Sequence, residues 1–163
     1  MTVSYIGIGS NVGDRIHFSR RAVEELTRAE GVEVSAISSF YETSPVGGPP
    51  QRSFINMVVR ISTQLEPRAL LELCKRIEDR IGREPSEIKW GPRVIDLDVL
   101  TYGEEKTNEP DLEIPHPRMT QRRFVLVPLL EIDPEATDPW GTPYAQWVDE
   151  AEGEVHLLEP FSP

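Results

Sequence analysis

Apolar and β-branched residues recur at strand-like spacing in four segments of the chain. These segments are residues 2–10 (TVSYIGIGS), 32–41 (VEVSAISSFY), 54–63 (FINMVVRIST) and 94–103 (VIDLDVLTYG). Side chains of a β-strand point alternately to its two faces, so segments of this kind can bury one face against a core. The pattern therefore predicts four β-strands.

Stripes of apolar residues at helical spacing lie between these strands. The first stripe ends at Gly31, and the second runs from Pro67, which a first helical turn tolerates, to Gly82. The first stripe contains Ile16, Val23 and Leu26, and the second contains Leu70, Leu71, Cys74, Ile77 and Ile81. The prolines and glycines of residues 44–52 (SPVGGPPQR) predict a long loop.

The order of these elements is β-α-β-β-α-β, which predicts an α/β (α+β) fold of the ferredoxin-like sandwich type. After it we expect a proline-punctuated loop, an apolar helix around residues 122–132 (RRFVLVPLLEI) and a polar tail, which together form a C-terminal helix-containing extension. A length of 163 residues suits one domain that spans residues 1–163.

Two aspartates stand out in the fourth predicted strand. Alternation places Asp96 and Asp98 on one face, about 7 Å apart along the strand at about 3.3 Å per residue. Magnesium prefers carboxylate oxygens combined with substrate phosphates and water. The pair therefore predicts a magnesium site, whereas a strand with polar residues facing the solvent is the alternative.

The approach to this strand carries arginines and an aromatic residue. Arg93 precedes the aspartates, Trp90 begins the rigid Trp-Gly-Pro segment before it, and Arg83 lies further back. Guanidinium groups suit phosphate oxygens, so this set of residues is typical of phosphoryl transfer. A plain ion-pair network between the arginines and the aspartates is the competing interpretation.

Two further groups of residues favour a small polyanionic or heterocyclic ligand. His116 stands between two prolines, with Arg122 following, and could donate to a phosphate from a loop. Asn56 offers a donor and an acceptor to the edge of a heterocycle, and Phe54 or Phe124 could stack on its faces. Each of these residues taken singly is also compatible with a core or turn role.

Charge and composition exclude several classes of protein. The formal net charge of −11 argues against nucleic-acid binding, although arginines cluster locally. The single cysteine, Cys74, and the absence of a signal-like start or a long apolar run predict a cytoplasmic protein with no membrane segment. No P-loop motif occurs, and the glycines of GIGSNVGDR lack dinucleotide-binding spacing, which leaves a tight turn with a helix cap.

The quoted segments, taken together, resemble the 6-hydroxymethyl-7,8-dihydropterin pyrophosphokinase family. The resemblance covers residues 2–140 and rests on W-G-P-R-x-x-D-x-D (residues 90–98) combined with P-H-P and R-x-F (residues 115–124). It implies transfer of diphosphate from ATP to the reduced pterin, with release of AMP, in folate biosynthesis. It also implies ATP as co-substrate and two Mg²⁺ ions. We expect a monomer that binds these small molecules.

The resemblance also implies residue roles. The metal ligands would be Asp96 and Asp98, and Arg83 and Arg93 would join them as catalytic residues. The ATP-binding residues would be Glu78, Trp90, Arg93, His116 and Arg122. The pterin-binding residues would be Thr43, Ser44, Pro45, Val46, Phe54, Asn56, Trp90 and Phe124.

The chain departs from the family pattern at three positions. Pro85 stands where many members have a second arginine, Glu113 where some have a hydroxylated residue, and Phe54 where some have tyrosine. Two rival functions also remain: a magnesium-dependent phosphohydrolase acting on a nucleotide, and a ferredoxin-like regulatory module that binds a ligand without chemistry.

Overall fold

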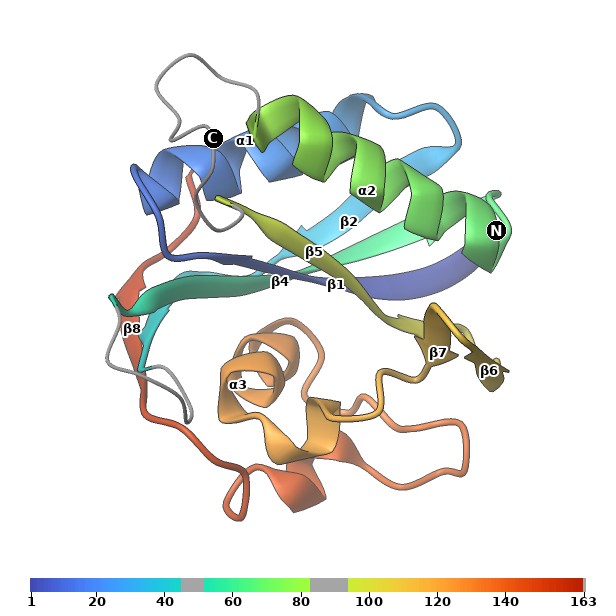
Figure 1. Cartoon of the computed structure of the whole chain (residues 1–163). Helices are drawn as coiled ribbons and strands as arrows, with labels where there is room; N and C mark the ends of the chain where they lie inside the picture. Colours follow the sequence, from blue (N-terminus) through green and yellow to red (C-terminus); the bar gives the residue numbers. More distant parts are fainter. Residues whose placement is uncertain (45–51, 83–93, 163) are drawn as a thin grey trace.

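The computed structural model describes residues 1–44, 52–82 and 94–162. An antiparallel six-stranded sheet in the order β5-β1-β4-β3-β8, with β2 also paired to β4, separates two helical layers (Figure 1). The strands are β1 (Thr2–Ser10), β2 (Val32–Ile37), β3 (Phe40–Thr43), β4 (Phe54–Thr63), β5 (Asp96–Tyr102) and β8 (Val155–Glu159). If β2 and β3 are counted together, β1 to β5 follow the predicted ferredoxin-like order around the helices α1 (Arg15–Arg28) and α2 (Pro67–Gly82).

The two faces of the sheet bury separate hydrophobic cores. Helices α1 and α2 cover one face, and the shorter helix α3 (Arg123–Ile132) lies with the C-terminal segments on the other (Figure 1). Ile6 and Ile8 of β1 point into the first core, whereas Tyr5 belongs to the second. The period-2 alternation of the strands thus divides their side chains between two helical layers.

The predicted strand 32–41 is wrong as a single element, because it breaks into β2 and β3 at Ser38 and Ser39. The Ser38 hydroxyl accepts a hydrogen bond from the Val58 backbone N–H at 2.9 Å. The backbone N–H of Ser39 donates to the Glu131 carboxylate of α3 at 2.8 Å instead of to a neighbouring strand. Serine side chains and an acid from a distant helix therefore replace part of the ladder.

The tail holds a strand that the polar pattern did not indicate. β8 pairs with β3 along the edge of the sheet, although its side chains are mostly exposed. A small hairpin, β6 (Thr107–Glu109) with β7 (Leu112–Ile114), occupies part of the predicted loop. Two 3-10 turns, Met119–Gln121 and Tyr144–Trp147, flank α3 in sequence.

The first glycine-rich segment divides between a strand and a turn. Gly7 and Gly9 lie inside β1, so the predicted tight turn is wrong for these two residues. Gly13 has a φ of +66°, and the Asp14 side chain caps α1 by accepting from the His17 N–H at 3.1 Å. The predicted cap is thereby confirmed.

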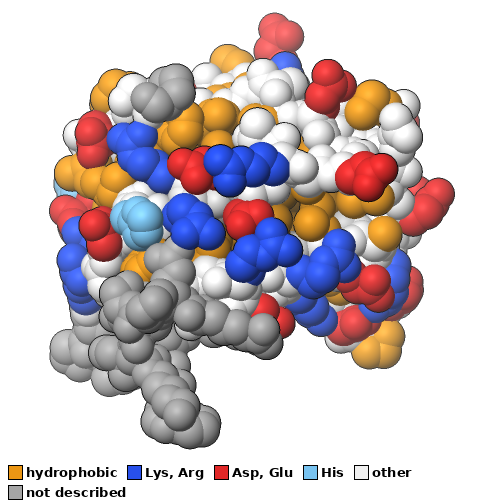
Figure 2. All heavy atoms as spheres, turned by 90° about the horizontal axis from the view of Figure 1, so that it is seen from above, with side chains coloured by type: hydrophobic (Ala, Val, Ile, Leu, Met, Phe, Trp, Pro, Cys, Tyr) orange, Lys and Arg blue, Asp and Glu red, His pale blue; other side chains and the backbone are white. Residues whose placement is uncertain are grey.

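The outer surface of α1 and α2 carries both signs of charge. Figure 2 shows acidic and basic side chains interspersed over this side of the molecule, without a broad patch of one sign. Ion pairs such as Arg80 with Glu25 link the two helices at 2.8 Å. In the described part of the chain, no helix is long and apolar enough to cross a membrane.

Candidate active site

A cavity of about 500 Å³ opens on the sheet face that α3 covers only in part. The strands contribute Gly7, Gly9, Thr43, Phe54, Asn56, Val58, Asp96, Asp98 and Leu100. The opposite wall includes Arg118, Gln121, Arg122, Phe124, Val125 and Glu152. Residues far apart in the sequence thus converge on one hollow that has a carboxylate side, an arginine side and two phenylalanines.

The two aspartates share one face of β5, as alternation predicts. Asp96 and Asp98 are exposed, whereas Leu97 is buried on the opposite face. The strand begins at Asp96 rather than at Val94. The pair therefore lies at the N-terminal end of an edge strand, where the carboxylate oxygens can reach a ligand.

Glycines provide the space in front of these aspartates. Gly9 pairs with Asp96 and Gly7 with Asp98 across the β1–β5 ladder, and both glycines line the cavity. Because neither glycine has a side chain, the floor beside each carboxylate stays open. Gly7 and Gly9 were not predicted as site residues, although a glycine inside a strand often marks a close approach of a ligand.

Asn56 lies across the same floor with a fixed orientation. Thr43 Oγ1 donates to Asn56 Oδ1 at 2.6 Å, which ties β3 to β4 at the cavity. A β-carbon built on Gly9 would lie 2.8 Å from Asn56 Nδ2. Only glycine therefore leaves the amide in place, and Asn56 can offer its N–H groups to a heterocycle.

Phe54 lies on β4 on the same side of the cavity as Asn56, whereas Arg122 and Phe124 lie on the wall that faces the sheet. Phe54 and Phe124 both line the cavity, and the Arg122 guanidinium lies 5.6 Å from the centre of the Phe124 ring. Burial lowers the pKa of Arg122, and Asp98 opposes this shift. The arginine thus stays available as a cation next to the carboxylates.

A second cavity of about 280 Å³ lies beside the first, and Asp98 lines both of them. Its other lining residues include Leu71, Leu97, Glu109, Asp111, Glu113, His116 and Pro117. Glu113, which departs from the family pattern, thus lies on this cavity. Asp98 consequently stands where ligands of the two cavities would meet.

His116 belongs to the second cavity and is held by its own loop. Its backbone N–H donates to the Leu100 carbonyl at 2.8 Å, and its Nδ1 accepts from the Arg118 N–H at 3.3 Å. Burial lowers the pKa of His116, whereas Asp98 raises it and Arg122 adds to the decrease. A neutral ring with Nδ1 as acceptor carries its proton on Nε2, which can donate to a ligand.

Glu78 is not among the residues that line either cavity in the described part of the chain. Its Oε2 accepts a hydrogen bond from the Leu97 backbone N–H at 2.8 Å. Leu97 lies between the two aspartates, so Glu78 links α2 to the strand that carries them. Its role in ATP binding remains a prediction.

The arrangement suits a hard cation that brings its own oxygen ligands. Among residues 1–44, 52–82 and 94–162, no group of three or more His, Cys, Asp or Glu side chains could enclose a metal. Two neighbouring carboxylates instead fit magnesium, which commonly keeps water and takes substrate phosphates as further ligands. The predicted site residues Pro45, Val46, Arg83, Trp90 and Arg93 lie outside the described residues, as does Pro85.

Comparison with known proteins shows one consistent family. The family model described as 7,8-dihydro-6-hydroxymethylpterin-pyrophosphokinase (HPPK) matches residues 5–134. The 2-amino-4-hydroxy-6-hydroxymethyldihydropteridine pyrophosphokinase of Bacillus subtilis (strain 168) is 48% identical over 130 residues, which are 80% of this chain and 77% of the relative. The protein of the same name from Aquifex aeolicus (strain VF5) is 42% identical over 162 residues, 99% of this chain and 96% of that one.

A solved structure supports the fold. The crystal structure of an HPPK-DHPS from Plasmodium falciparum superposes with a TM-score of 0.73 at 14% identity. The match covers 91% of this chain and 45% of that one, so the chain spans less than half of the HPPK-DHPS protein. At this identity the likeness concerns the fold alone.

Proposed function

The chain belongs to the 7,8-dihydro-6-hydroxymethylpterin-pyrophosphokinase family, and we infer that it transfers diphosphate from ATP to the hydroxymethyl oxygen of 6-hydroxymethyl-7,8-dihydropterin. AMP is the second product, and the reaction is a step of folate biosynthesis. The observation that carries this proposal within the structure is the position of Asp98, which lines two adjoining cavities. Two substrates bound in those cavities would meet at a carboxylate.

We assign the pterin to the larger cavity. Phe54 and Phe124 can stack on the ring, and Asn56, held by Thr43, can bond its edge. Ser44 lines the same cavity. By family resemblance, the assignment also includes Pro45, Val46 and Trp90.

We assign ATP to the smaller cavity and to the passage past Asp98. His116 can donate from Nε2 to a phosphate, and Arg122 can neutralise phosphate charge from the wall of the larger cavity. By family resemblance, Glu78, Trp90 and Arg93 also bind ATP, and Arg83 and Arg93 stabilise the charge of the transferred group.

Asp96 and Asp98 are the proposed ligands of two magnesium ions. Magnesium bound there with the ATP phosphates would neutralise charge on the entering and leaving oxygens. The pterin hydroxyl oxygen attacks the β-phosphorus in line and loses its proton to solvent. The bond between that phosphorus and the oxygen bridging the α- and β-phosphates breaks, so that AMP departs with this oxygen. A metal-bound carboxylate is a poor base, so we assign Asp98 the role of a metal ligand.

One incubation separates this function from its rivals. The protein is mixed with ATP, magnesium and the reduced hydroxymethylpterin, and the nucleotide products are separated by chromatography. Pterin-dependent AMP release supports the transferase, whereas ADP or phosphate release without pterin would indicate a phosphohydrolase. No turnover would favour a module that only binds ligands.

We further propose one domain that spans residues 1–163 and acts as a cytoplasmic monomer. Both hydrophobic cores are built on the same sheet, which supports a single cooperative unit. Size-exclusion chromatography with light scattering checks the mass, and a single unfolding transition observed by two probes checks the cooperativity.

A further inference from the structure

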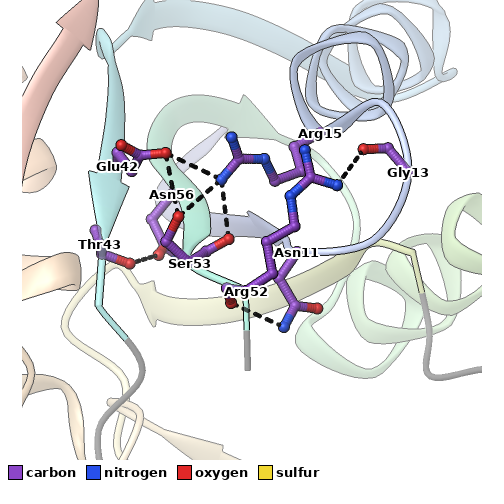
Figure 3. A network of polar contacts seen from close by, with 8 residues as sticks. All are labelled: Asn11, Gly13, Arg15, Glu42, Thr43, Arg52, Ser53 and Asn56. Carbon is purple, nitrogen blue, oxygen red and sulfur yellow. Dashed lines mark hydrogen bonds and ion pairs between the residues drawn. The ribbon is translucent and has the colours of Figure 1, made fainter. Parts of the chain in front are cut away.

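The N-terminal end of α1 contacts the back of the β3–β4 hairpin through one arginine. Arg15 is the first residue of α1, and its side chain is only 16% exposed. Its Nη1 donates to the Ser53 carbonyl at 2.9 Å, to Ser53 Oγ at 3.0 Å and to Glu42 Oε2 at 3.2 Å. Ser53 Oγ in turn donates to Glu42 Oε2 at 3.1 Å, which closes a triangle of polar contacts (Figure 3).

A second contact joins the same two regions of the chain. Arg52 donates from Nη1 to the Gly13 carbonyl at 3.0 Å, and Asn11 Nδ2 donates to the Arg52 carbonyl at 3.5 Å (Figure 3). The turn before α1 thus contacts the entry to β4 independently of Arg15. The position of this strand end is consequently set from the turn as well as from α1.

The residues held by Arg15 adjoin those that line the larger cavity. Glu42 immediately precedes Thr43, and Ser53 immediately precedes Phe54. Thr43 and Phe54 face each other in the β3–β4 ladder, followed by the pair Glu42 and Ile55. The arginine therefore secures both strands of the hairpin within one residue of the cavity.

Strand alternation explains how a contact on one face controls the other. Thr43 lines the cavity and bonds Asn56, so Glu42, one residue earlier, projects to the opposite side, where Arg15 meets it. Any slide or separation of the two strands would alter the 2.6 Å hydrogen bond between Thr43 and Asn56. A displaced Asn56 would bond the pterin edge less well in the ground state and in the transition state alike, which raises the KM for pterin and leaves kcat unchanged.

We propose that Arg15 is a positioning residue for the pterin, acting through Glu42 and Ser53 on the hairpin that carries Thr43 and Asn56. This inference rests on the proposed function and assigns the arginine no contact with substrate. The effect is confined to the pterin, because the residues that we assign to ATP in the smaller cavity lie on other elements. The predicted signature is a change in the KM for pterin without a matching change in kcat.

The test compares Arg15→Met with Arg15→Lys. Methionine removes every donor, so we expect the KM for pterin to rise about tenfold, with kcat and the KM for ATP within about twofold of wild type. All three contacts of Arg15 come from one nitrogen, Nη1, and lysine also carries three donors on one nitrogen. The KM for pterin of Arg15→Lys should therefore stay within about threefold of wild type. Pterin affinity measured by fluorescence titration should follow the KM.

A matched control removes a different arginine ion pair. Arg80→Met breaks the 2.8 Å pair with Glu25 that joins α2 to α1, outside the lining of both cavities. It should leave all the kinetic constants within about twofold of wild type. If Arg15→Met fails to fold, Glu42→Gln provides the second variant, since it keeps the shape and weakens the contact, and it should raise the KM for pterin about threefold.

Two results would overturn the positioning role. One is a KM for pterin within twofold of wild type in Arg15→Met or, where that variant does not fold, in Glu42→Gln. The other is an equal loss in both KM values and kcat, which indicates general damage to the protein. If the wild-type protein releases no AMP with pterin, the proposed function itself fails and this inference fails with it, so the two failures are distinguishable.

Discussion

Replacement of Gly9 by alanine tests the packing of the proposed pterin cavity. The new β-carbon would lie 2.8 Å from Asn56 Nδ2, closer than non-bonded atoms approach each other. Backbone atoms of a paired strand cannot yield easily, so the amide must rotate away. The 2.6 Å hydrogen bond from Thr43 would then be lost or weakened.

The two effects of this change differ in size. Loss of one neutral hydrogen bond costs about 1 kcal/mol of folding free energy. An asparagine that no longer bonds the pterin edge would lose about two such bonds to the ligand, or about 2 kcal/mol, which is about 30-fold in the dissociation constant. We therefore expect a small drop in stability and a much larger loss of pterin affinity.

Calorimetric titration of pterin and of an unreactive ATP analogue measures both affinities on the same sample. Gly7→Ala is the comparator, because the nearest atom to its β-carbon is a Leu100 side-chain carbon at 3.5 Å, an ordinary contact. It should weaken pterin binding less than about fivefold, since no bonding group is displaced. ATP affinity should stay within about twofold of wild type in Gly9→Ala.

A double substitution shows whether the effect passes through the amide. Asn56→Ala alone should weaken pterin binding about as much as Gly9→Ala. Because both changes remove the same contacts, the combined variant should be no weaker than either single one. Additive losses, or an unchanged pterin affinity in Gly9→Ala, would refute the reasoning.

The remaining predictions concern the metal, the pH dependence and the buried thiol. Asp98→Asn should lower kcat by about 100-fold or more and raise the magnesium concentration needed for activity, because a ligand to the metal is lost. A modest decrease in kcat with unchanged magnesium dependence would contradict the role of Asp98 as a metal ligand. Burial, and then the hydrogen bond to Asp133, raises the pKa of Tyr5 to about 12. Because the unfolded chain ionises first, the contribution of Tyr5 to the unfolding free energy should be constant below about pH 10 and fall toward pH 12. Tyr5→Phe should therefore reduce the decrease in unfolding free energy measured between these two pH values. Burial raises the pKa of Cys74 to about 12, so a thiol reagent at pH 8 should label it only after denaturation, and rapid labelling of the native protein would contradict its burial.

Local patterns predicted much of this protein correctly. Period-2 alternation is a property of the strand backbone, so it placed Asp96 and Asp98 on one face without any knowledge of their neighbours. Apolar stripes likewise predicted α2 from Pro67 to Gly82, and the order of elements predicted the ferredoxin-like core. These features depend on residues within one or two turns of each other.

Other features depend on which strand lies next to which. The pairing of β8 with β3 uses backbone hydrogen bonds and leaves mostly exposed side chains, so β8 has no buried face that the sequence could indicate. The break at Ser39 requires Glu131, which is 92 residues away. Serine and glutamate are common on protein surfaces, so neither residue type indicates such a contact in the sequence.

The sequence by itself determined α1, α2 and the order of the ferredoxin-like core, the paired aspartates and, through its motifs, the family. Only the tertiary structure decided that Asp98 stands between two cavities, that Gly9 makes room for Asn56, and that Arg15 secures the hairpin beside them. The physical reason is distance along the chain. Periodicity indicates to which face of an element a side chain points. A cavity and the residues that support it depend instead on the register between strands that are far apart in the sequence.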